Sequence, residues 1–239
     1  MAQQTSHDEI RVSERSRGGG PRQRDRADQI VDAAMKLFSE QGYGAVSLRE
    51  IARESGVAVS TVAYHHVDKL SLLGEIYERC TRPMNARRLE LLGEAQRIDE
   101  ASARLTAILR AYLLPAFTSS DDTIHGGARF TRMRAVLSAE GDPEARRIIA
   151  EAFDATTRQF IDAICACLPG ASREAVVWQC QFLLGALYYT LINPDRIDRL
   201  SDGRTSGADH ETAIGMIVRS THASLMALMP PPEEAVLQG

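Results

Sequence analysis

Residues 47–69 are the segment that most constrains how this chain folds, because they specify the ends of three helices in succession. Ser47 and Glu50 fit a capping box, in which each side chain accepts a hydrogen bond from a backbone N–H group near the helix start. The helix that begins there is about two turns long, too short to be stable alone in water. Gly56 supplies the positive φ that ends a helix, and Asp68 is placed to cap a third one. The pattern predicts two short helices joined by a glycine turn, followed at once by another helix.

This arrangement is typical of a helix-turn-helix, whose second helix enters the DNA major groove. The surrounding residues strengthen the interpretation: IVDAAMKLF stands at 30–38, QGYG at 41–44 and TVAYHHVDK at 61–69. On these residues the segment 22–69 resembles the DNA-binding domain of the TetR family of bacterial transcriptional regulators. The resemblance implies an N-terminal three-helix DNA-binding domain and a double-stranded DNA operator as its partner.

Three positions depart from the family pattern. Ala58 stands where a capping side chain is usual, at a cost of about 1 kcal/mol of helix stability. Ala63 replaces a common tyrosine. His66 replaces a phenylalanine of the small core, so we expect it to be buried there, next to Val62, rather than to sense pH. These changes leave the predicted base-reading surface small and apolar.

The resemblance also implies which side chains meet DNA. Val59, Ser60 and Ala63 would face the base edges, where apolar groups fit thymine methyl groups and a hydroxyl can donate or accept. None of them can make a bidentate contact with guanine or adenine, so specificity would depend on DNA shape, on Arg49 or on the N-terminal arm. The predicted phosphate contacts are Ser47, Thr61, Tyr64, His65 and Lys69, with core packing as the alternative for Tyr64.

The composition favours a local nucleic-acid contact over a generally basic surface. The chain has 239 residues, 44% of them hydrophobic, and a formal net charge of −4, so it can bury a substantial core without coating DNA. The basic segment is residues 1–21, an arm that we expect to be disordered; whether it also touches DNA is left open. The four cysteines form no C-x-x-C pair, and the first residues lack an apolar signal-peptide core, which predicts a cytoplasmic protein with reduced thiols.

Downstream of residue 69 the apolar residues recur at helical spacing, so we expect an all-α protein. Helices are predicted at 22–41, from 69 onward, and at 100–118, 127–140, 143–168, 172–193 and 209–229. Pro83 is expected to kink or split the helix that starts at 69. The predicted organisation is the arm at 1–21, a DNA-binding domain at 22–70, a regulatory and dimerisation domain at 71–229 and a tail at 230–239. The longest apolar run, 182–192, is too short to cross a bilayer of about 30 Å, so no membrane partner is expected.

The C-terminal part carries a second resemblance, through F-x-x-M-R at 130–134 and W-x-x-x-F-L-L-G-A at 178–186. Both segments look like a subgroup of TetR regulators that includes sensors of fatty acids or their thioesters, which implies a small-molecule effector of that kind. Helical bundles can enclose an apolar cavity. The predicted ligand-binding residues are Phe130, Met133, Arg134, Phe153 and Phe160. Arg132 or Arg134 could anchor an acidic head group; ordinary core packing, or solvation of the arginines, is the alternative.

The helix predicted at 172–193 is apolar nearly all round, which indicates burial on more than one side. Together with the helix at 209–229 it resembles the family's four-helix dimer interface. The predicted interface residues are Trp178, Phe182, Gly185, Ala186, Tyr189 and Ile217. We therefore expect a homodimer, most simply a repressor that binds a near-palindromic operator and is released by a small hydrophobic effector.

Enzyme and cofactor sites are not indicated. His65 and His66 are adjacent, so their rings diverge by about 100° on a helix and cannot chelate one ion as an i, i+4 pair would. The sequence contains no G-x-S-x-G nucleophile elbow, and HGG at 125–127 has no matching nucleophile. We expect no catalytic residue, no metal and no cofactor. The alternative to a regulator is a helical ligand-binding or protein-interaction module whose helix-turn-helix is vestigial.

Overall fold

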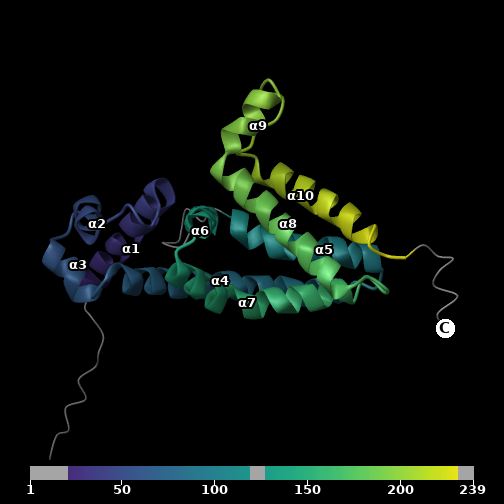
Figure 1. The fold of residues 1–239 in the computed structure, drawn as a ribbon, viewed down its shortest axis with the longest axis horizontal. Helices are drawn as coiled ribbons and strands as arrows, with labels where there is room; N and C mark the ends of the chain where they lie inside the picture. Colours follow the sequence, from purple (N-terminus) through teal and green to yellow (C-terminus); the bar gives the residue numbers. More distant parts are fainter. Residues whose placement is uncertain (1–20, 119–126, 231–239) are drawn as a thin grey trace, which may run out of the picture.

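The computed structural model describes residues 21–118 and 127–230, and over these residues the protein consists of ten helices and no strands. The all-α prediction is confirmed. The predicted arm up to residue 20, the stretch 119–126 and the tail beyond 230 lie outside the described residues. Figure 1 shows an elongated molecule, in which the first three helices form one end and the other helices extend away from it.

The N-terminal end has the helix-turn-helix that the sequence predicts. α1 (Pro21–Gln41) is followed by α2 (Leu48–Ser55) and α3 (Val59–His65). Ser47 and Glu50 form the predicted capping box, in which the Ser47 N–H donates to Glu50 Oε2 over 2.7 Å. Gly56 ends α2 with a φ of 70°, and Asp68 caps the next helix by accepting from the Ser71 N–H over 2.7 Å. These local signals set the helix ends.

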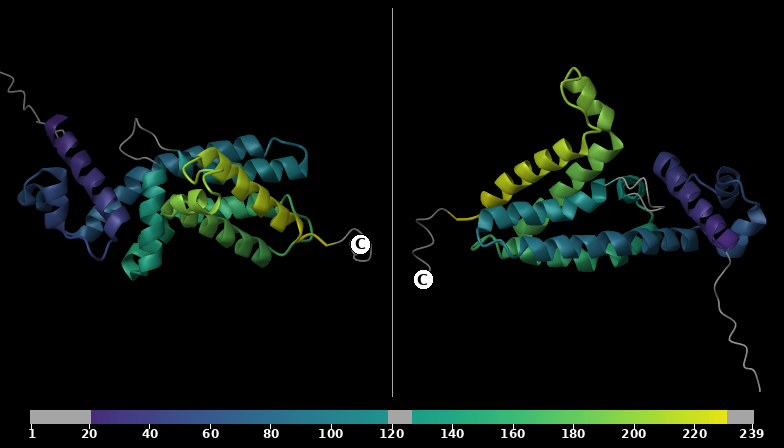
Figure 2. Two further views of the ribbon diagram at one scale, coloured as in Figure 1. Left: turned by 90° about the horizontal axis from the view of Figure 1, so that it is seen from above. Right: turned by 180° about the vertical axis from the view of Figure 1, so that it is seen from behind.

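α4 (Lys69–Ala95) is one continuous helix that leads from the DNA-binding end into the rest of the molecule. Pro83 lies inside it, so of the two predicted outcomes, a kink or a split, the split does not occur. Pro83 has no backbone N–H, so one hydrogen bond of the helix is missing there. α5 and α7 pack along α4 and support the helix on both sides of this gap. α4 therefore connects the helix-turn-helix directly to the C-terminal bundle (Figure 2).

The C-terminal bundle contains the predicted helices and one more. They are α5 (Ala101–Phe117), α6 (Gly127–Glu140), α7 (Pro143–Cys165), α8 (Arg173–Ile192) and α10 (His210–Met226). The sequence pattern does not predict α9 (Pro194–Leu200), because Asn193-Pro194 indicates the end of α8. Pro194 also starts a new helix, at a first-turn position that tolerates proline. α9 has no buried residue and hence no apolar periodicity; it projects from the bundle in Figure 1.

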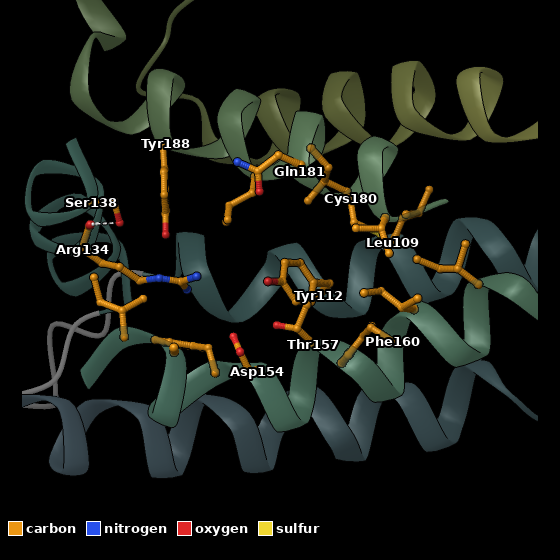
Figure 3. Close-up of a pocket in the computed structure, with 18 of the residues that line it drawn as sticks. Leu109, Tyr112, Arg134, Ser138, Asp154, Thr157, Phe160, Cys180, Gln181 and Tyr188 are labelled. Atoms are coloured by element: carbon orange, nitrogen blue, oxygen red, sulfur yellow. Dashed lines mark hydrogen bonds between the residues drawn. The ribbon is translucent and has the colours of Figure 1, made fainter. Parts of the chain in front are cut away.

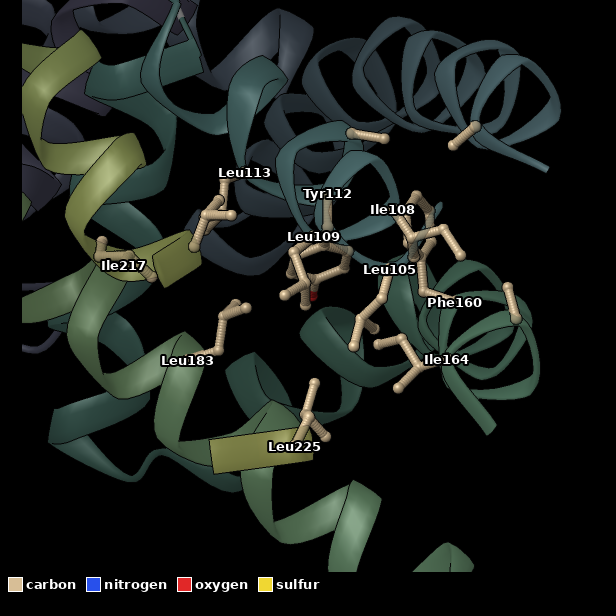
Figure 4. Packing of buried hydrophobic residues seen from close by; sticks show 14 of the residues in the cluster. Leu105, Ile108, Leu109, Tyr112, Leu113, Phe160, Ile164, Leu183, Ile217 and Leu225 are labelled. Atoms are coloured by element: carbon tan, nitrogen blue, oxygen red, sulfur yellow. The ribbon is translucent and has the colours of Figure 1, made fainter. Parts of the chain in front are cut away.

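Two clusters of buried apolar residues hold the helices together. The first lies among α5, α7, α8, α10 and the end of α4, and Figure 4 shows Leu109, Phe160, Leu183 and Leu225 within it. The second joins α1–α4 to α6 and to the first half of α7. α6 is thus part of the core beneath the helix-turn-helix, whereas α5, the helix before it in the chain, belongs to the other core. The division into two domains at residue 70 stays a prediction.

α8 has one buried and one exposed apolar side. Its buried residues are Val176, Leu183, Leu187 and Leu191. On the other side Trp178, Phe182 and Tyr189 are 62%, 59% and 53% exposed. The whole of α8 is long and apolar enough to cross a membrane, with a mean hydropathy of 1.4, although the apolar run at 182–192 alone is too short. Core helices of soluble proteins pass the same test, so this is weak evidence for a membrane span. A single copy of the chain therefore leaves part of the apolar surface of α8 exposed, and the burial expected on more than one side is not found within it.

Candidate DNA-binding surface and ligand cavity

α3 presents most of its predicted DNA-facing side chains to solvent. Val62 is fully buried and anchors the helix to the core formed with α1, α2 and α4. Tyr64 is 76% exposed, so it does not pack in that core. Of the predicted DNA-binding residues, Ser47, Arg49, Val59, Ser60, Ala63 and Tyr64 are exposed, and Thr61, His65 and Lys69 are half-buried. They belong to the end of the molecule that α2 and α3 form in Figure 1.

Two departures from the family pattern have visible consequences. Ala58 precedes α3 without a side-chain cap. His66 is 2% exposed and occupies the core position predicted for it. Its Nδ1 lies 3.6 Å from Glu75 Oε2, and its Nε2 has no hydrogen-bond partner among the described residues. Burial lowers the pKa of His66, and the Glu75 carboxylate opposes this only in part, because the neighbouring charges of His65 and Arg79 also lower it.

We expect acidification to destabilise the helix-turn-helix through His66. Because the pKa of the buried imidazole is lowered from 6.5, the unfolded chain binds a proton more readily as the pH falls past that value. The stability that neutral His66 contributes is therefore fully present above the pKa of the unfolded chain, and it is lost as the pH falls below that value. His66→Phe should therefore flatten the decline between about pH 7 and pH 5 in thermal unfolding of the full chain. His65→Phe is the matched control, and an equally steep decline in His66→Phe would contradict the assignment.

Lys69 holds the start of α4 to the turn between α1 and α2. Its Nζ donates hydrogen bonds to the carbonyl oxygens of Tyr43 and Val46, the second over 2.8 Å, and lies 4.3 Å from the centre of the Tyr43 ring. A phosphate contact would have to share the amino group with these bonds or replace them. The side chain thus has a structural role that the sequence pattern does not reveal, and its DNA contact stays a prediction.

A cavity of about 360 Å³ lies among α5, α6, α7 and α8, within the usual size range of small-molecule sites. One end is apolar, with Leu109 and Phe160 among its lining residues (Figure 3). The other end is polar and carries Tyr112, Arg134, Ser138, Thr157 and Tyr188. Lining residues that are also exposed, such as Arg146, Asp154 and Gln181, belong to α7 and α8, so the cavity opens between these two helices.

Three of the five predicted ligand-binding residues line this cavity, namely Arg134, Phe153 and Phe160. Phe130 and Met133 do not, because they are fully buried in the core that α6 shares with α1–α4. There Phe130 packs edge-on against Tyr77 of α4, with the ring centres 5.0 Å apart. Of the two candidate head-group anchors, Arg132 is exposed on the outside, whereas Arg134 is 5% exposed and reaches the cavity.

Sequence reasoning missed most of the polar end of the cavity. Tyr112, Thr157 and Tyr188 line it beside Arg134, and they come from three different helices. A partial signal exists, since Tyr112 and Tyr188 each lie in an otherwise apolar stretch of helix and therefore place a hydroxyl group inside a bundle. That these groups converge on one arginine follows only from the packing of the helices.

α6 connects the cavity to the DNA-binding end. Arg134 reaches the cavity, and the last residue of the helix, Glu140, accepts hydrogen bonds from the N–H groups of Tyr43, over 2.9 Å, and Gly44, over 3.4 Å. Gly42 permits this approach, because its φ is 86° and a Cβ atom there would collide with the Glu140 carboxylate. A displacement of α6 would therefore move the turn that precedes α2.

Comparison with known proteins assigns both ends of the chain to one family. Residues 30–76 match the family model for bacterial regulatory proteins of the tetR family, and residues 110–224 match that of the tetracyclin repressor-like C-terminal domain. The chain belongs to the TetR family. The family resemblance seen in the helix-turn-helix sequence is confirmed, and with it the class of protein, a bacterial transcriptional regulator.

Individual relatives agree with the TetR assignment. The transcriptional repressor KstR of Mycolicibacterium smegmatis is 27% identical over 149 residues, which cover 56% of this chain and 73% of KstR. The transcriptional regulator AcrR of Shigella flexneri is 45% identical over 49 residues, 20% of this chain and 23% of AcrR. Among solved structures, the fatty acid degradation regulator FadR from Bacillus halodurans has the same fold, with a TM-score of 0.55 and 16% identity over 88% of this chain and 97% of FadR.

In this TetR-family chain, most of the predicted dimer residues lie on an open surface. Trp178, Phe182, Gly185, Ala186 and Tyr189 are exposed on α8. The rings of Trp178 and Phe182 are 5.9 Å apart, centre to centre. Ile217 of α10 is instead 8% exposed and packs in the protomer's own core, so it is not available to a partner. The adjacent Met216, 54% exposed, is the large apolar side chain that α10 presents to solvent.

Proposed function

We propose that this TetR-family regulator is a homodimeric repressor that binds a near-palindromic operator and is released from it by a small hydrophobic effector. The observation that carries the proposal is the position of α6, which contributes to the core beneath the helix-turn-helix, to the cavity wall and to the turn before α2. Ligand and DNA can therefore influence each other through one helix. The relative KstR is a transcriptional repressor, which favours repression over activation.

The DNA contact would be made by α3 and its surroundings. The exposed side chains of Val59, Ser60, Ala63 and Tyr64 offer methyl and hydroxyl groups to base edges and phosphates. Arg49, exposed at the start of α2, would add a charged contact. Because this surface has few groups that distinguish one base from another, the shape of the operator would contribute to specificity.

A second copy of the chain is the partner that we propose for the exposed side of α8. Trp178, Phe182 and Tyr189 are large aromatic side chains, whose burial commonly stabilises interfaces. Gly185 lies among them, and a Cβ atom there would meet nothing within 4 Å in one protomer, which leaves room for a partner helix. A two-fold dimer would place two recognition helices about 34–36 Å apart, one turn of DNA. We place such a protein in the cytoplasm, in contact with DNA rather than with a membrane.

The effector would act by shifting the protein between two states. A ligand that fits the cavity best after α6 has moved would favour an arrangement in which the two recognition helices no longer match successive major grooves. The hydrogen bonds from Tyr43 and Gly44 to Glu140 are the contacts that would transmit the movement. The ligand must bind the DNA-incompetent state more tightly, since equal affinity for both states would shift nothing.

Tyr64→Ala tests the DNA-binding part of the proposal. The side chain is 76% exposed, so its loss should leave the fold intact. We expect affinity for DNA from the region upstream of the gene to fall about tenfold, the effect of roughly 1.4 kcal/mol. A mobility-shift titration measures this, with Leu89→Ala, an exposed apolar residue of α4, as the control.

Two outcomes of this assay would count against the proposal. If Tyr64→Ala binds as tightly as the wild type, Tyr64 is not a DNA-binding residue. If the wild-type protein shifts no upstream DNA at all, the chain is better described as a helical ligand-binding or protein-interaction module whose helix-turn-helix is vestigial.

A further inference from the structure

Two buried arginine side chains lie at the polar end of the cavity. Arg134 of α6 is 5% exposed and lines the cavity, and Arg88 of α4 is fully buried next to two of the wall residues. The Arg88 guanidinium carbon lies 4.2 Å from the centre of the Tyr112 ring and 5.7 Å from that of Phe153. The Arg134 guanidinium carbon lies 3.7 Å from the centre of the same Phe153 ring. The two cations therefore share an aromatic neighbour.

Neither guanidinium group has a carboxylate within ion-pair distance in the described part of the chain. Arg88 donates its Nε–H to the Tyr112 carbonyl oxygen over 2.9 Å, but both of its Nη atoms are buried without a hydrogen-bond partner there, as is Arg134 Nε. Asp154 also lines the cavity, and Figure 3 draws its carboxylate on the side of Arg134 and Thr157. Its side chain is largely exposed, and its Oδ2 lies 3.6 Å from Arg158 Nη2 rather than within ion-pair distance of Arg134 or Arg88. Within the described residues, therefore, no carboxylate forms an ion pair with either of the two buried arginines.

Arg88 remains charged at neutral pH. Burial lowers the pKa of Arg88, but only to about 10. Burial would raise the pKa of Tyr112, yet that pKa is lowered, because the charges of Arg88 and Arg134 outweigh the effect. An uncompensated buried charge reduces the stability of a fold. A protein that keeps two of them beside a cavity gains most when an anion occupies that cavity.

The remainder of the cavity fits the other part of an amphiphile. In Figure 3 the side chains of Thr157 and Tyr188 point into the cavity near Arg134, whereas Leu109 and Phe160 lie toward its other end. Hydroxyl groups and a guanidinium group donate hydrogen bonds to an oxyanion, and the apolar end can exclude water from a hydrocarbon chain. The cavity therefore separates a cationic, hydrogen-bonding end from an apolar one.

We propose that the effector is an organic anion with one carboxylate head group, held by Arg134 in the positive field of Arg88, and an apolar tail that lies against Leu109 and Phe160. This inference rests on the proposed function in one respect, that the cavity is the effector site. The cavity volume is about 360 Å³, which is the volume that roughly a dozen molecules occupy in liquid water. This size suits a medium-chain acid.

Calorimetric titration of the full-length protein with decanoate and with 1-decanol tests the head group. The two probes have the same tail, and we expect decanoate to bind at least about tenfold more tightly. Arg134→Met should remove most of this preference. Arg132→Met is the matched control, because it removes the same charge from an exposed position of the same helix and should leave the preference intact. Equal affinity of the wild type for both probes, or an unchanged preference in Arg134→Met, would overturn the proposal.

Arg88→Met distinguishes a role in binding the anion from a role in the fold. If Arg88 is kept for the ligand, an apolar side chain of similar length should leave the melting temperature of the ligand-free protein unchanged or raised, while decanoate binds several-fold more weakly. A lowered melting temperature combined with wild-type affinity for decanoate would overturn the part of the proposal that concerns Arg88.

The titrations contain no DNA, so failure of this inference is distinguishable from failure of the proposed function. A protein that binds its operator but shows no preference for decanoate refutes the carboxylate head group and leaves the regulator intact. A protein that prefers decanoate but binds no operator supports the head-group assignment and refutes the repressor.

Discussion

Phe182→Glu is expected to dissociate the protein into monomers and to weaken operator binding by more than about 100-fold. Phe182 is 59% exposed in the protomer, so a carboxylate at this position costs the isolated fold little. In a two-fold dimer the substitution occurs twice, and a buried carboxylate without a partner costs roughly 3 kcal/mol or more. At about 1.4 kcal/mol for each factor of ten, that cost moves the dimerisation equilibrium by two orders of magnitude. A monomer would present one recognition helix to an operator built for two.

Light scattering at micromolar concentration measures the mass of this variant, and circular dichroism verifies that the helices remain. Leu89→Glu is the control, since Leu89 is also an exposed apolar residue but lies on α4. If Phe182→Glu stays dimeric, or if the wild-type protein is itself monomeric, the exposed side of α8 is not the interface.

Tyr77→Ala is expected to lower the free energy of unfolding by roughly 3–5 kcal/mol, a large part of the stability of a typical domain. Tyr77 of α4 is 1% exposed, and its ring packs edge-on against Phe130 of α6 and Phe153 of α7, with centres 5.0 and 6.4 Å away. Truncation to alanine leaves a void at the place where the core of the helix-turn-helix meets the wall of the cavity. Denaturant unfolding followed by circular dichroism measures the loss.

Tyr77→Phe separates the contribution of the ring from that of the hydroxyl group. The hydroxyl oxygen is buried without a hydrogen-bond partner among the described residues, and burial raises its pKa well above the ordinary value. Its removal should leave the free energy of unfolding unchanged or raise it by about 1 kcal/mol. If Tyr77→Phe is destabilised as strongly as Tyr77→Ala, packing of the ring is not what holds this junction together.

The helix ends are the part of the fold that the sequence predicts best. Ser47, Gly56 and Asp68 all act where the pattern places them. Each of them bonds to backbone groups only a few residues away or adopts a special φ, so the signal lies within one short window. α9 shows the limit of such signals, because a helix that buries no side chain leaves no apolar period in the sequence.

The candidate site was predictable only in part. Helical spacing places Phe130, Phe153 and Phe160 inside a bundle, but it does not say which of two interiors each one enters. Phe130 packs in the core of the DNA-binding end, whereas Phe153 and Phe160 line the cavity. The same ambiguity affects Ile217, which the pattern places at an interface and the structure places in the protomer's own core.

The sequence by itself determined the helical class, the helix ends that carry a local cap, the family and the helix-turn-helix, because all of these depend on residues that are close together in the chain. Only the tertiary structure decided that Arg88 and Arg134 meet at one end of a cavity, and that Glu140 reaches the turn at Tyr43. These contacts join residues from separate helices. Their geometry follows from how the helices pack against one another, which no local pattern of residues specifies.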